Sequence, residues 1–309
     1  SIILLFININ SSLSMFALIT GASSGIGFQY ARVMAKRGYD LVIVSNEESI
    51  HERAKEIQEE FAVQVIALVR DLGKQDAAKE LYDYCHAQDI EIEVLINNAG
   101  VYHDCDFLND SEGFNMLIMN LHMITPTMLQ YYFAKDMKAR KKGYILNMCS
   151  ITANIAVQRL GTYGATKAFL QHFTRCTHIE MKDYGVIITN VSPGAVNTGL
   201  YNIRSWLTKM GLAMGYIVSP EYLARRGVKA LFRRRAKVTV PAVWNYVLLF
   251  FVALIPTSSI KSFKVIVFPV LLLILISSPS LNNLFFASFS LIPFLLSLSN
   301  KLSISFIVY

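Results

Sequence analysis

Acidic residues are missing from the last part of the chain. All 22 aspartates and glutamates lie before residue 222, whereas residues 222–309 hold 10 lysines and arginines. A stretch with long apolar runs and no carboxylate does not have the composition of an ordinary globular surface. The sequence therefore predicts two regions that meet between residues 221 and 245, a slightly acidic body and a basic, apolar end.

The basic residues of the second region gather just before its apolar runs. A pI near 9.1 is compatible with nucleic-acid binding, but a basic cluster that precedes a hydrophobic stretch fits an anionic membrane face better. A solvated helix face explains the cluster equally well, so these two interpretations stay open and we expect no nucleic-acid partner. The cluster consists of Arg225, Arg226, Lys229, Arg233, Arg234, Arg235 and Lys237.

Cysteine is scarce, and histidine lacks the spacing of metal ligands. The four cysteines form no CxxC pair, which excludes a small disulfide-rich scaffold and indicates reduced thiols in a cytoplasmic compartment. The six histidines form no HExxH motif, so we expect no metal site.

Both ends of the chain differ from the body. Residues 1–14 are apolar but have no preceding lysine or arginine, unlike a signal peptide, and Met15 is a natural initiator. We expect residues 1–14 to be an extension outside the fold. The apolar stretches at 243–254, 265–276 and 284–298 are each shorter than the roughly 20 residues that cross a bilayer. They could lie on a membrane, pair with each other, cover a dimer face, or be foreign to the natural fold.

Between the two ends, short apolar runs alternate with amphipathic stretches of helical length. Strands that are apolar throughout are buried on both faces, as in a parallel sheet covered by helices, and the alternation predicts right-handed crossovers. The expected strands are 16–20, 40–45, 63–69, 93–97, 144–149, 185–191 and 237–240, and the expected helices 25–37, 48–61, 74–88, 111–139 and 161–183.

This pattern predicts an α/β fold with one doubly wound parallel sheet. We expect a single catalytic domain over residues 15–245, followed by a hydrophobic extension over residues 246–309 that is membrane-associated or non-native. Residues 195–218 are the least regular and are expected to form a flap over the substrate. The apolar side chains of that flap are Trp206, Leu207, Met210, Leu212 and Met214.

A glycine-rich turn joins the first expected strand to the first helix. Thr20-Gly-Ala-Ser-Ser-Gly-Ile-Gly27 would let the backbone approach a pyrophosphate, whose charge lies at the helix N-terminus. Four further patterns follow strand ends or lie on helices: Asn97-Asn-Ala-Gly100, Asn120, Ser150 with Tyr163-Gly-Ala-Thr-Lys167, and Pro193-Gly194 with Thr198.

These motifs, in this order, resemble those of the short-chain dehydrogenase/reductase family over about residues 15–245. The resemblance implies a Rossmann-type domain and members such as 17β-hydroxysteroid dehydrogenases and 3-ketoacyl reductases. It also implies catalytic roles for Asn120, Ser150, Tyr163 and Lys167, with Asn120 holding a water that links Lys167 to solvent. The cofactor-binding residues that it implies are Gly21, Ser23, Ser24, Gly25, Ile26, Gly27, Ser45, Asn46, Asp71, Leu72, Asn98, Ala99, Gly100, Tyr163, Lys167, Pro193, Gly194, Val196 and Thr198.

The chemistry of the catalytic set agrees with that resemblance. Tyr163 and Lys167 are four residues apart and share a helix face. A free phenol has a pKa near 10, and a neighbouring ammonium lowers it toward neutrality. Ser150 follows a strand at the sheet edge where ligands bind, and its hydroxyl can hold a substrate oxygen as charge develops there. Cys149, beside it, is expected in the core.

The residues after the second strand bear on the choice of cofactor. Family members that prefer NAD usually have an acid at the position of Ser45, and members that prefer NADP often have an arginine at that of Asn46; this chain has neither. Without the acid a 2′-phosphate is not repelled, so NADP(H) is favoured over NAD(H) by a small margin, against which Glu47 and Glu48 count. Asp71-Leu72 resembles the pair that contacts adenine.

The sequence thus predicts an NAD(P)-dependent oxidoreductase that interconverts a carbonyl and an alcohol, on a lipophilic ketoacyl or steroid-like substrate. The alternative is a non-catalytic dinucleotide-binding scaffold attached to a membrane. The resemblance also implies a homo-oligomer, a dimer or tetramer, formed through the long helices of the second half. We expect a cytoplasmic location, with a membrane surface as a further partner of the C-terminal region.

Overall fold

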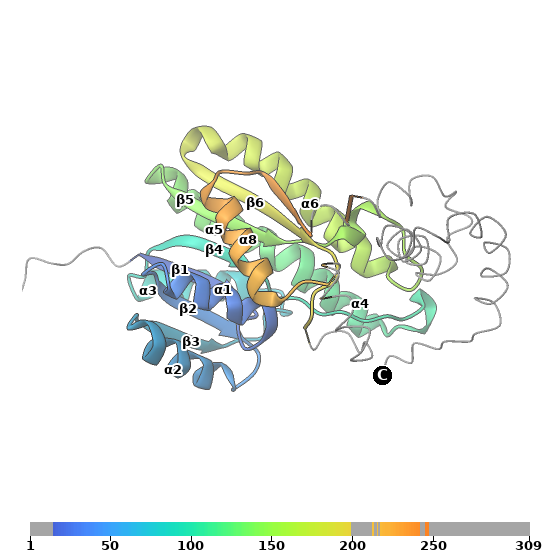
Figure 1. Cartoon of the computed structure of the whole chain (residues 1–309), viewed down its shortest axis with the longest axis horizontal. Coiled ribbons are helices and arrows are strands. Elements are labelled where there is room, and N and C mark those ends of the chain that lie inside the picture. The colour runs from blue at the N-terminus through green and yellow to red at the C-terminus, as the bar shows by residue number, and fades with distance from the viewer. Residues whose placement is uncertain (1–14, 199–211, 213–214, 216, 242–244, 247–309) are drawn as a thin grey trace, which may run out of the picture.

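A seven-stranded parallel sheet forms the centre of the computed structural model, which describes residues 15–198, 212, 215, 217–241 and 245–246 (Figure 1). The strand order is β3-β2-β1-β4-β5-β6-β7, the doubly wound arrangement expected from the alternating pattern. The strands are β1 Phe16–Thr20, β2 Asp40–Ser45, β3 Val65–Val69, β4 Ile92–Asn97, β5 Gly143–Met148, β6 Val186–Pro193 and β7 Lys237–Val240.

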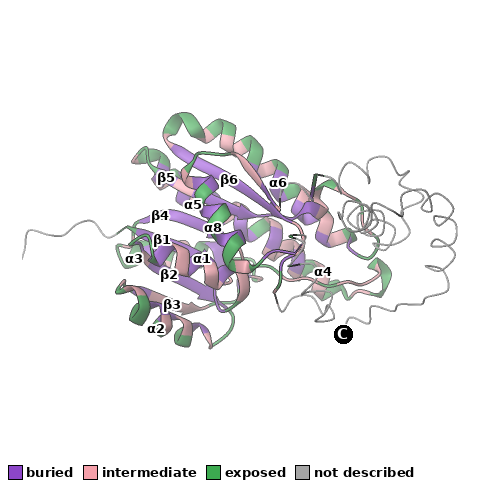
Figure 2. Ribbon diagram, in the orientation of Figure 1, coloured by how far each residue is buried: buried purple, intermediate pink, exposed green. Residues whose placement is uncertain are grey.

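Helices cover both faces of this sheet. On one face, α1, α2 and α8 bury Tyr30, Ile57 and Leu223 against the strands; on the other, α3 and α5 bury Leu81 and Leu129. The central strands β1, β4 and β6 are buried throughout, whereas β3 at one edge of the sheet is mostly half-buried (Figure 2). The helices are α1 Gly25–Ala35, α2 Ile50–Phe61, α3 Ala77–Ala87, α4 Glu112–Met119, α5 Thr125–Ala139, α6 Gly161–Met181 and α8 Pro220–Phe232.

The helix expected over residues 111–139 is not continuous. A π-helical turn, Asn120–Ile124, separates α4 from α5, and its end is closed by the Thr125 N–H bonding to the Asn120 carbonyl. Pro126 has no N–H and its ring would collide with a carbonyl four residues earlier, so the regular hydrogen-bond ladder cannot pass this point. The extra residue of the π turn redirects the side chains that precede α5.

Helix α8 was not among the expected helices. Its buried side includes Leu223, Val228 and Leu231, while Arg225 and Lys229 are exposed. All but the last residue of the basic cluster therefore occupy the solvated side of this amphipathic helix and the turn that follows it, and the last one, half-buried, begins β7. This placement fits a solvated helix face and leaves the same side chains accessible to an anionic membrane surface, so both interpretations stay open.

The remaining expectations differ from the structure only at element boundaries or fall outside it. Short 3₁₀ turns occur at Phe107–Asn109, Ile151–Asn154 and Lys182–Tyr184. The extension 1–14, nearly all of the tail beyond 246, and most of the expected flap lie outside the described residues. No described helix combines the length and the apolar character that crossing a bilayer requires.

Candidate active site

The glycine-rich turn and the Asn98-Ala99 segment hold each other at the carboxyl end of the sheet. The Thr20 hydroxyl accepts hydrogen bonds from the backbone N–H groups of Asn98 and Ala99, both at 3.0 Å. The Asn98 amide donates to the carbonyls of Thr20 and Gly21, at 3.0 and 3.1 Å. Two motifs that are 77 residues apart in sequence thus form one rigid surface.

Glycine is required at two places in this surface. A Cβ on Gly27 would lie 1.9 Å from the Gly21 carbonyl oxygen, and one on Gly21, where φ is +68°, would lie 2.8 Å from the Ala99 Cα. The turn therefore presents backbone without side chains at the start of α1, where the positive end of the helix dipole favours a phosphate. These residues fit a dinucleotide pyrophosphate, and Thr198 lies beside them, its methyl 3.7 Å from where a Gly25 Cβ would be.

Helix α6 carries the expected proton-transfer pair. Lys167 is buried, and its Nζ donates to the Met148 carbonyl at 3.1 Å, two residues before Ser150. The same Nζ lies 5.7 Å from the centre of the Tyr163 ring, so the ammonium and the phenol share one face of the helix as their spacing predicts. Ser150 is buried and its Oγ accepts from the Thr152 hydroxyl at 2.9 Å.

Burial changes the acidity of this ammonium. Removal from water lowers the pKa of Lys167 to about 8, because the charged form is penalised in a poorly solvated site. The neighbouring Cys149 thiol is itself buried, which raises its pKa to about 12 and keeps it neutral. Cys149 is thus a core thiol, as expected, and is unsuited to act as a nucleophile.

Tyr163 is held between two aromatic side chains. The rings of Tyr102 and His122 both meet it edge-on, with centroids at 5.4 and 5.6 Å. Such T-shaped contacts match the positive edge of one ring to the negative face of another. The phenol ring therefore has little freedom to turn.

His122 is a site residue that sequence reasoning missed. It is 1% exposed, its Nε2 accepts from the Val101 N–H at 3.0 Å, and its Nδ1 lies 3.2 Å from the Thr166 hydroxyl oxygen. Because that hydroxyl donates to the Tyr163 carbonyl at 2.8 Å, it accepts from His122, which fixes the neutral tautomer with its proton on Nδ1. A single histidine without a motif around it gives no signal in a sequence.

The ring of His122 connects the two halves of the site. Its hydrogen bonds join the segment after Gly100 to the first turns of α6, which carry Tyr163. Burial, with a smaller contribution from the nearby charge of Lys167, lowers the pKa of His122 well below its usual value. The imidazole stays neutral, so both hydrogen bonds persist across the physiological pH range.

Asn120 lies in the π turn, with its side chain turned toward another segment. Its amide donates to the Gly73 carbonyl at 3.1 Å. A small cavity of about 10 Å³, close to the space that one water molecule needs, is lined instead by Asn97, His122 and Lys167 among others. The buried Asn97 Oδ1 has no hydrogen-bond partner among the described residues. The role of Asn120 in holding a water thus remains a prediction that its side-chain contacts do not support.

The residues expected near the cofactor's adenosine end lie along the carboxyl edges of β2 and β3. Ser45 is buried and donates to the Ser23 hydroxyl at 3.0 Å, whereas Asn46 is exposed. Asp71 accepts from the Gly73 N–H at 2.9 Å, and Leu72 is buried. The end of β2 therefore has no carboxylate at position 45. The Ser45 hydroxyl is engaged by Ser23.

The last motif is built into the sheet edge. The Gly194 N–H bonds to the Val240 carbonyl at 2.9 Å, and Val196 pairs with Val218. The pairing of β6 with β7 therefore fixes Pro193 and Gly194 at the same end of the sheet as the glycine-rich turn. Of the expected flap side chains, only Leu212 lies within the described residues, and it is exposed.

Comparison with known proteins agrees with this geometry. The profile of the short chain dehydrogenase family matches residues 15–206. This chain belongs to that family. It is similar to very-long-chain 3-oxoacyl-CoA reductase-B of Danio rerio, at 34% identity over 63% of either chain, and to the corresponding human reductase, at 30% identity over 63% of this chain and 64% of the relative. The chain thus spans less than two thirds of the length of these relatives.

Solved structures of the family share the fold. A short-chain dehydrogenase from Sphingobium yanoikuyae in complex with NADPH superposes with a TM-score of 0.66 at 26% identity, covering 81% of this chain and 97% of that one. Membership of the family and the Rossmann-type sheet, both expected from the motifs, are therefore confirmed.

Proposed function

We propose that this member of the family is an NAD(P)-dependent oxidoreductase that interconverts a carbonyl and an alcohol. The observation that carries the proposal is the buried ammonium of Lys167. It lies beside the Tyr163 ring and donates a hydrogen bond to the Met148 carbonyl, two residues before Ser150. A protein that only bound a dinucleotide would gain nothing from burying a lysine there, because desolvation of a cation is costly. This argues against the scaffold alternative.

The chain's own residues would divide the work as follows. The Ser150 hydroxyl holds the substrate oxygen, and Tyr163 gives that oxygen a proton during reduction or removes it during oxidation. Lys167 favours the phenolate that is left, and the two edge-on rings hold the phenol in place. Gly21 and Gly27, together with Asn98 and Ala99, form the surface that holds the dinucleotide, which supplies or accepts the hydride when it is bound.

NADP(H) is the cofactor that we propose. The end of β2 has a serine and an exposed asparagine where an acid would repel a 2′-phosphate, and the similar dehydrogenase from Sphingobium yanoikuyae was solved with NADPH. Titration of the purified protein with NADPH and NADH, followed by the change in fluorescence, should show tighter binding of NADPH. Equal affinity, or tighter NADH binding, would contradict this preference.

A lipophilic substrate fits the surroundings of Tyr163. Its ring packs in an apolar cluster with Ile118 and Leu160, against which Phe114 and Val157 also pack. Relatives named very-long-chain 3-oxoacyl-CoA reductases suggest a 3-oxoacyl chain. A steroid-like ketone is the second candidate, because it would meet the same apolar wall.

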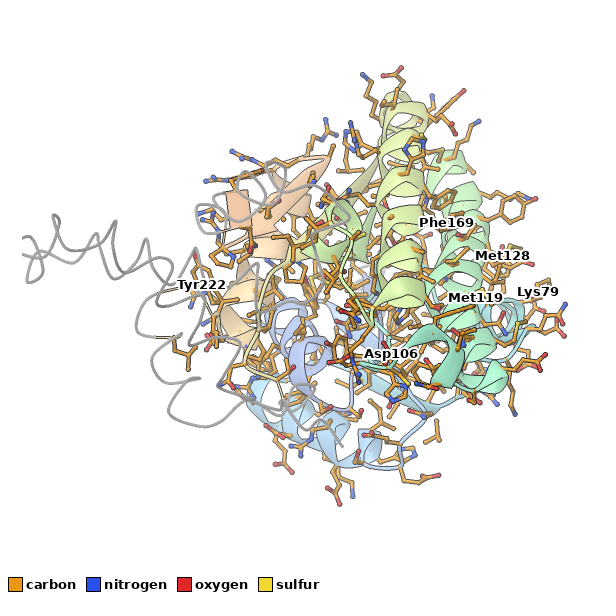
Figure 3. All side chains as sticks on the ribbon, turned by 90° about the vertical axis from the view of Figure 1, so that its right-hand side faces the viewer. Lys79, Asp106, Met119, Met128, Phe169 and Tyr222 are labelled. Atoms are coloured by element: carbon orange, nitrogen blue, oxygen red, sulfur yellow. The ribbon has the colours of Figure 1, made fainter. Side chains whose placement is uncertain are left out.

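We also propose a homo-oligomer formed through α5 and α6. Several large apolar side chains on this outer side are exposed, among them Tyr131, Phe169 and Ile179, and Phe169 and Met128 lie on these neighbouring helices in Figure 3. Exposed apolar patches of this kind commonly mark protein contacts.

Location in the cytoplasm with attachment to a membrane surface through the C-terminal region is a further proposal, which alkaline carbonate extraction of the full chain would test.

The activity itself is tested with Tyr163→Phe. The ring and its packing remain, but the proton donor is gone, so turnover of 3-oxoacyl and steroid ketones should fall by at least about 100-fold, in line with general acid catalysis. Binding of NADPH should stay within about twofold of the original. A variant that turns over normally, or one that loses cofactor affinity and rate together, would overturn the proposed role.

A further inference from the structure

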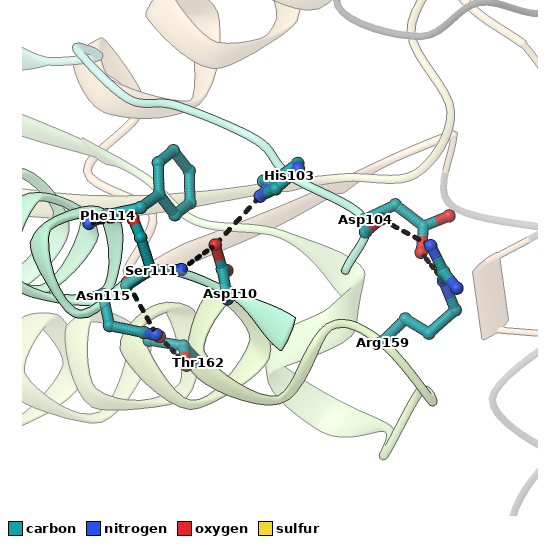
Figure 4. A network of polar contacts seen from close by, with 8 residues as sticks. All are labelled: His103, Asp104, Asp110, Ser111, Phe114, Asn115, Arg159 and Thr162. Carbon is teal, nitrogen blue, oxygen red and sulfur yellow. Dashed lines mark hydrogen bonds and ion pairs between the residues drawn. The ribbon is translucent and has the colours of Figure 1, made fainter. Parts of the chain in front are cut away.

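The segment between β4 and α4 carries three side chains that the proposed oxidoreductase does not use. His103, Cys105 and Asp110 lie close together, with one ligand atom of each within 4.8 Å of the others. Figure 4 shows the closest pair, in which the His103 Nδ1 lies 3.2 Å from an Asp110 carboxylate oxygen. Imidazole, thiolate and carboxylate are together the ligand types that zinc prefers in proteins.

The separations suit a tetrahedral ion. Zinc lies about 2.0–2.2 Å from nitrogen and oxygen ligands and about 2.3 Å from sulfur, which places ligand atoms roughly 3.3–3.8 Å apart. The His103–Asp110 pair, at 3.2 Å, is within about 0.1 Å of this range. The Cys105 sulfur, within 4.8 Å of the other two ligand atoms, has to approach by up to about 1 Å, which a change at one side-chain torsion provides. We propose that His103, Cys105 and Asp110 bind a zinc ion, with a fourth position open to solvent.

The backbone around these ligands is held in advance. The Cys105 N–H donates to the Arg159 carbonyl at 3.2 Å. The Arg159 guanidinium is bound by Asp104 (Figure 4) and lies 3.4 Å from an Asp106 carboxylate oxygen. Asp110 accepts from the Ser111 N–H at 3.1 Å. Ordered ligands lose little conformational entropy on binding, which favours affinity.

The exposure of the ligands matches an ion at the surface of the loop. The side chain of Asp110 is 12% exposed and that of His103 is 46% exposed. The carboxylate would therefore bind the ion from the protein side, and the imidazole from the solvent side. The His103 ring meets Phe114 edge-on at 4.9 Å, which orients it. The loop also carries Asp104 and Asp106, and their negative charge, only partly balanced by Arg159, attracts a divalent cation.

The site is separate from the proposed catalytic groups but adjoins them. Tyr102, next to His103, is one of the two rings that hold Tyr163. A bound ion would link residues 103 and 105 to residue 110, next to the contact between Tyr102 and Tyr163, without taking part in proton transfer. This proposal replaces the expectation of no metal site, which rested on the absence of known ligand spacings. A single HxC pair followed by an aspartate five residues later matches none of them.

The test is zinc binding by the full chain after treatment with a chelator. Competition against a chromophoric chelator should show one tight zinc per chain, and cobalt in its place should give the thiolate-to-metal charge-transfer band of a cysteine ligand. Cys105→Ser should weaken zinc by at least about tenfold and abolish that band, since groups that merely support a ligand already contribute that much. Asp110→Asn, which keeps an acceptor for the Ser111 N–H, should weaken it similarly.

The matched control is Cys176→Ser, because Cys176 is an exposed free thiol on α6. It should leave both the affinity and the cobalt band unchanged. Zinc binding below one ion per chain, equal binding by Cys105→Ser, or an equal loss in Cys176→Ser would each overturn the site. NADPH binding by every variant reports that the fold is intact, and this readout is independent of whether the chain reduces ketones.

Discussion

Lys167 links burial directly to catalysis. Its ammonium donates to a backbone carbonyl and lies beside the phenol it assists, yet its burial brings the pKa down to about 8. The charge that favours the phenolate is therefore itself lost within the accessible pH range.

A pH profile of ketone reduction should report this loss. Reduction needs a protonated Lys167, so kcat/KM should fall as pH rises through about 8. Lys167→Arg keeps a positive charge at every accessible pH, and its remaining activity should therefore decline only at higher pH. The same decline near pH 8 in this variant would show that another group is responsible.

His122 offers a second test at this scale. His122→Phe keeps the ring edge against Tyr163 but removes the acceptor of the Val101 N–H, which should lower the free energy of unfolding by about 1–3 kcal/mol. A small displacement of the phenol should also reduce kcat, by up to about 100-fold. Urea denaturation and steady-state kinetics measure the two effects.

His86→Phe is the control, because His86 is an exposed ring on α3. It should change stability by no more than about 0.5 kcal/mol and leave kcat unaltered. Equal effects in the two variants would remove the positioning role of His122.

The elements show what could be predicted from sequence and what could not. The bounds of β1 and β2 were predicted to the residue, since apolar runs between turn residues define buried strands. The break between α4 and α5 was missed, because a proline inside a helical pattern does not reveal the extra residue of a π turn. Among the site residues, motif positions were placed at the expected strand ends, whereas His122 becomes visible only when α6 packs beside the π turn.

Helix α8 was missed although its signals are present. Ser219 caps it by accepting from the Tyr222 N–H at 3.1 Å, and Pro220 begins it. Its buried side includes small residues such as Ala224 and Gly227, which give only a weak apolar periodicity. The basic residues were therefore recognised in the sequence, but not the helix that carries them.

Gly227 permits the close contact between α8 and α1. A Cβ there would lie 2.5 Å from the Tyr30 hydroxyl, which donates to the buried Met148 sulfur at 3.1 Å. Gly227→Ala should therefore lower the free energy of unfolding by about 1–3 kcal/mol through overpacking. In α4, Gly113→Ala meets nothing within 4 Å and should be neutral or up to about 1 kcal/mol more stable. Parallel urea titrations distinguish them, and a neutral Gly227→Ala would contradict the tight contact.

For the whole molecule, the sheet order and the helices on its two faces were predictable, because alternating strands and helices leave few topologies. How the molecule associates could not be predicted, since exposed apolar residues on α5 and α6 do not form a motif.

Phe169→Glu should place a charge in the proposed contact and shift the protein toward monomer in sedimentation velocity. Tyr222→Glu, on the exposed side of α8, should leave the sedimentation coefficient unchanged. The reverse pattern would place the contact on α8.

The position of β7 and α8 also determines where the chain can be shortened. The Asn190 N–H bonds to the Ala236 carbonyl at 2.9 Å, the Thr189 hydroxyl donates to the Arg235 carbonyl at 2.7 Å, and Tyr30 lies under α8. A fragment cut at residue 206, where the family match stops, would remove β7, one of the two strands that pair with β6, and would open Tyr30 to water. Expression trials and domain-grafting designs should therefore retain at least residues 15–241 as one unit.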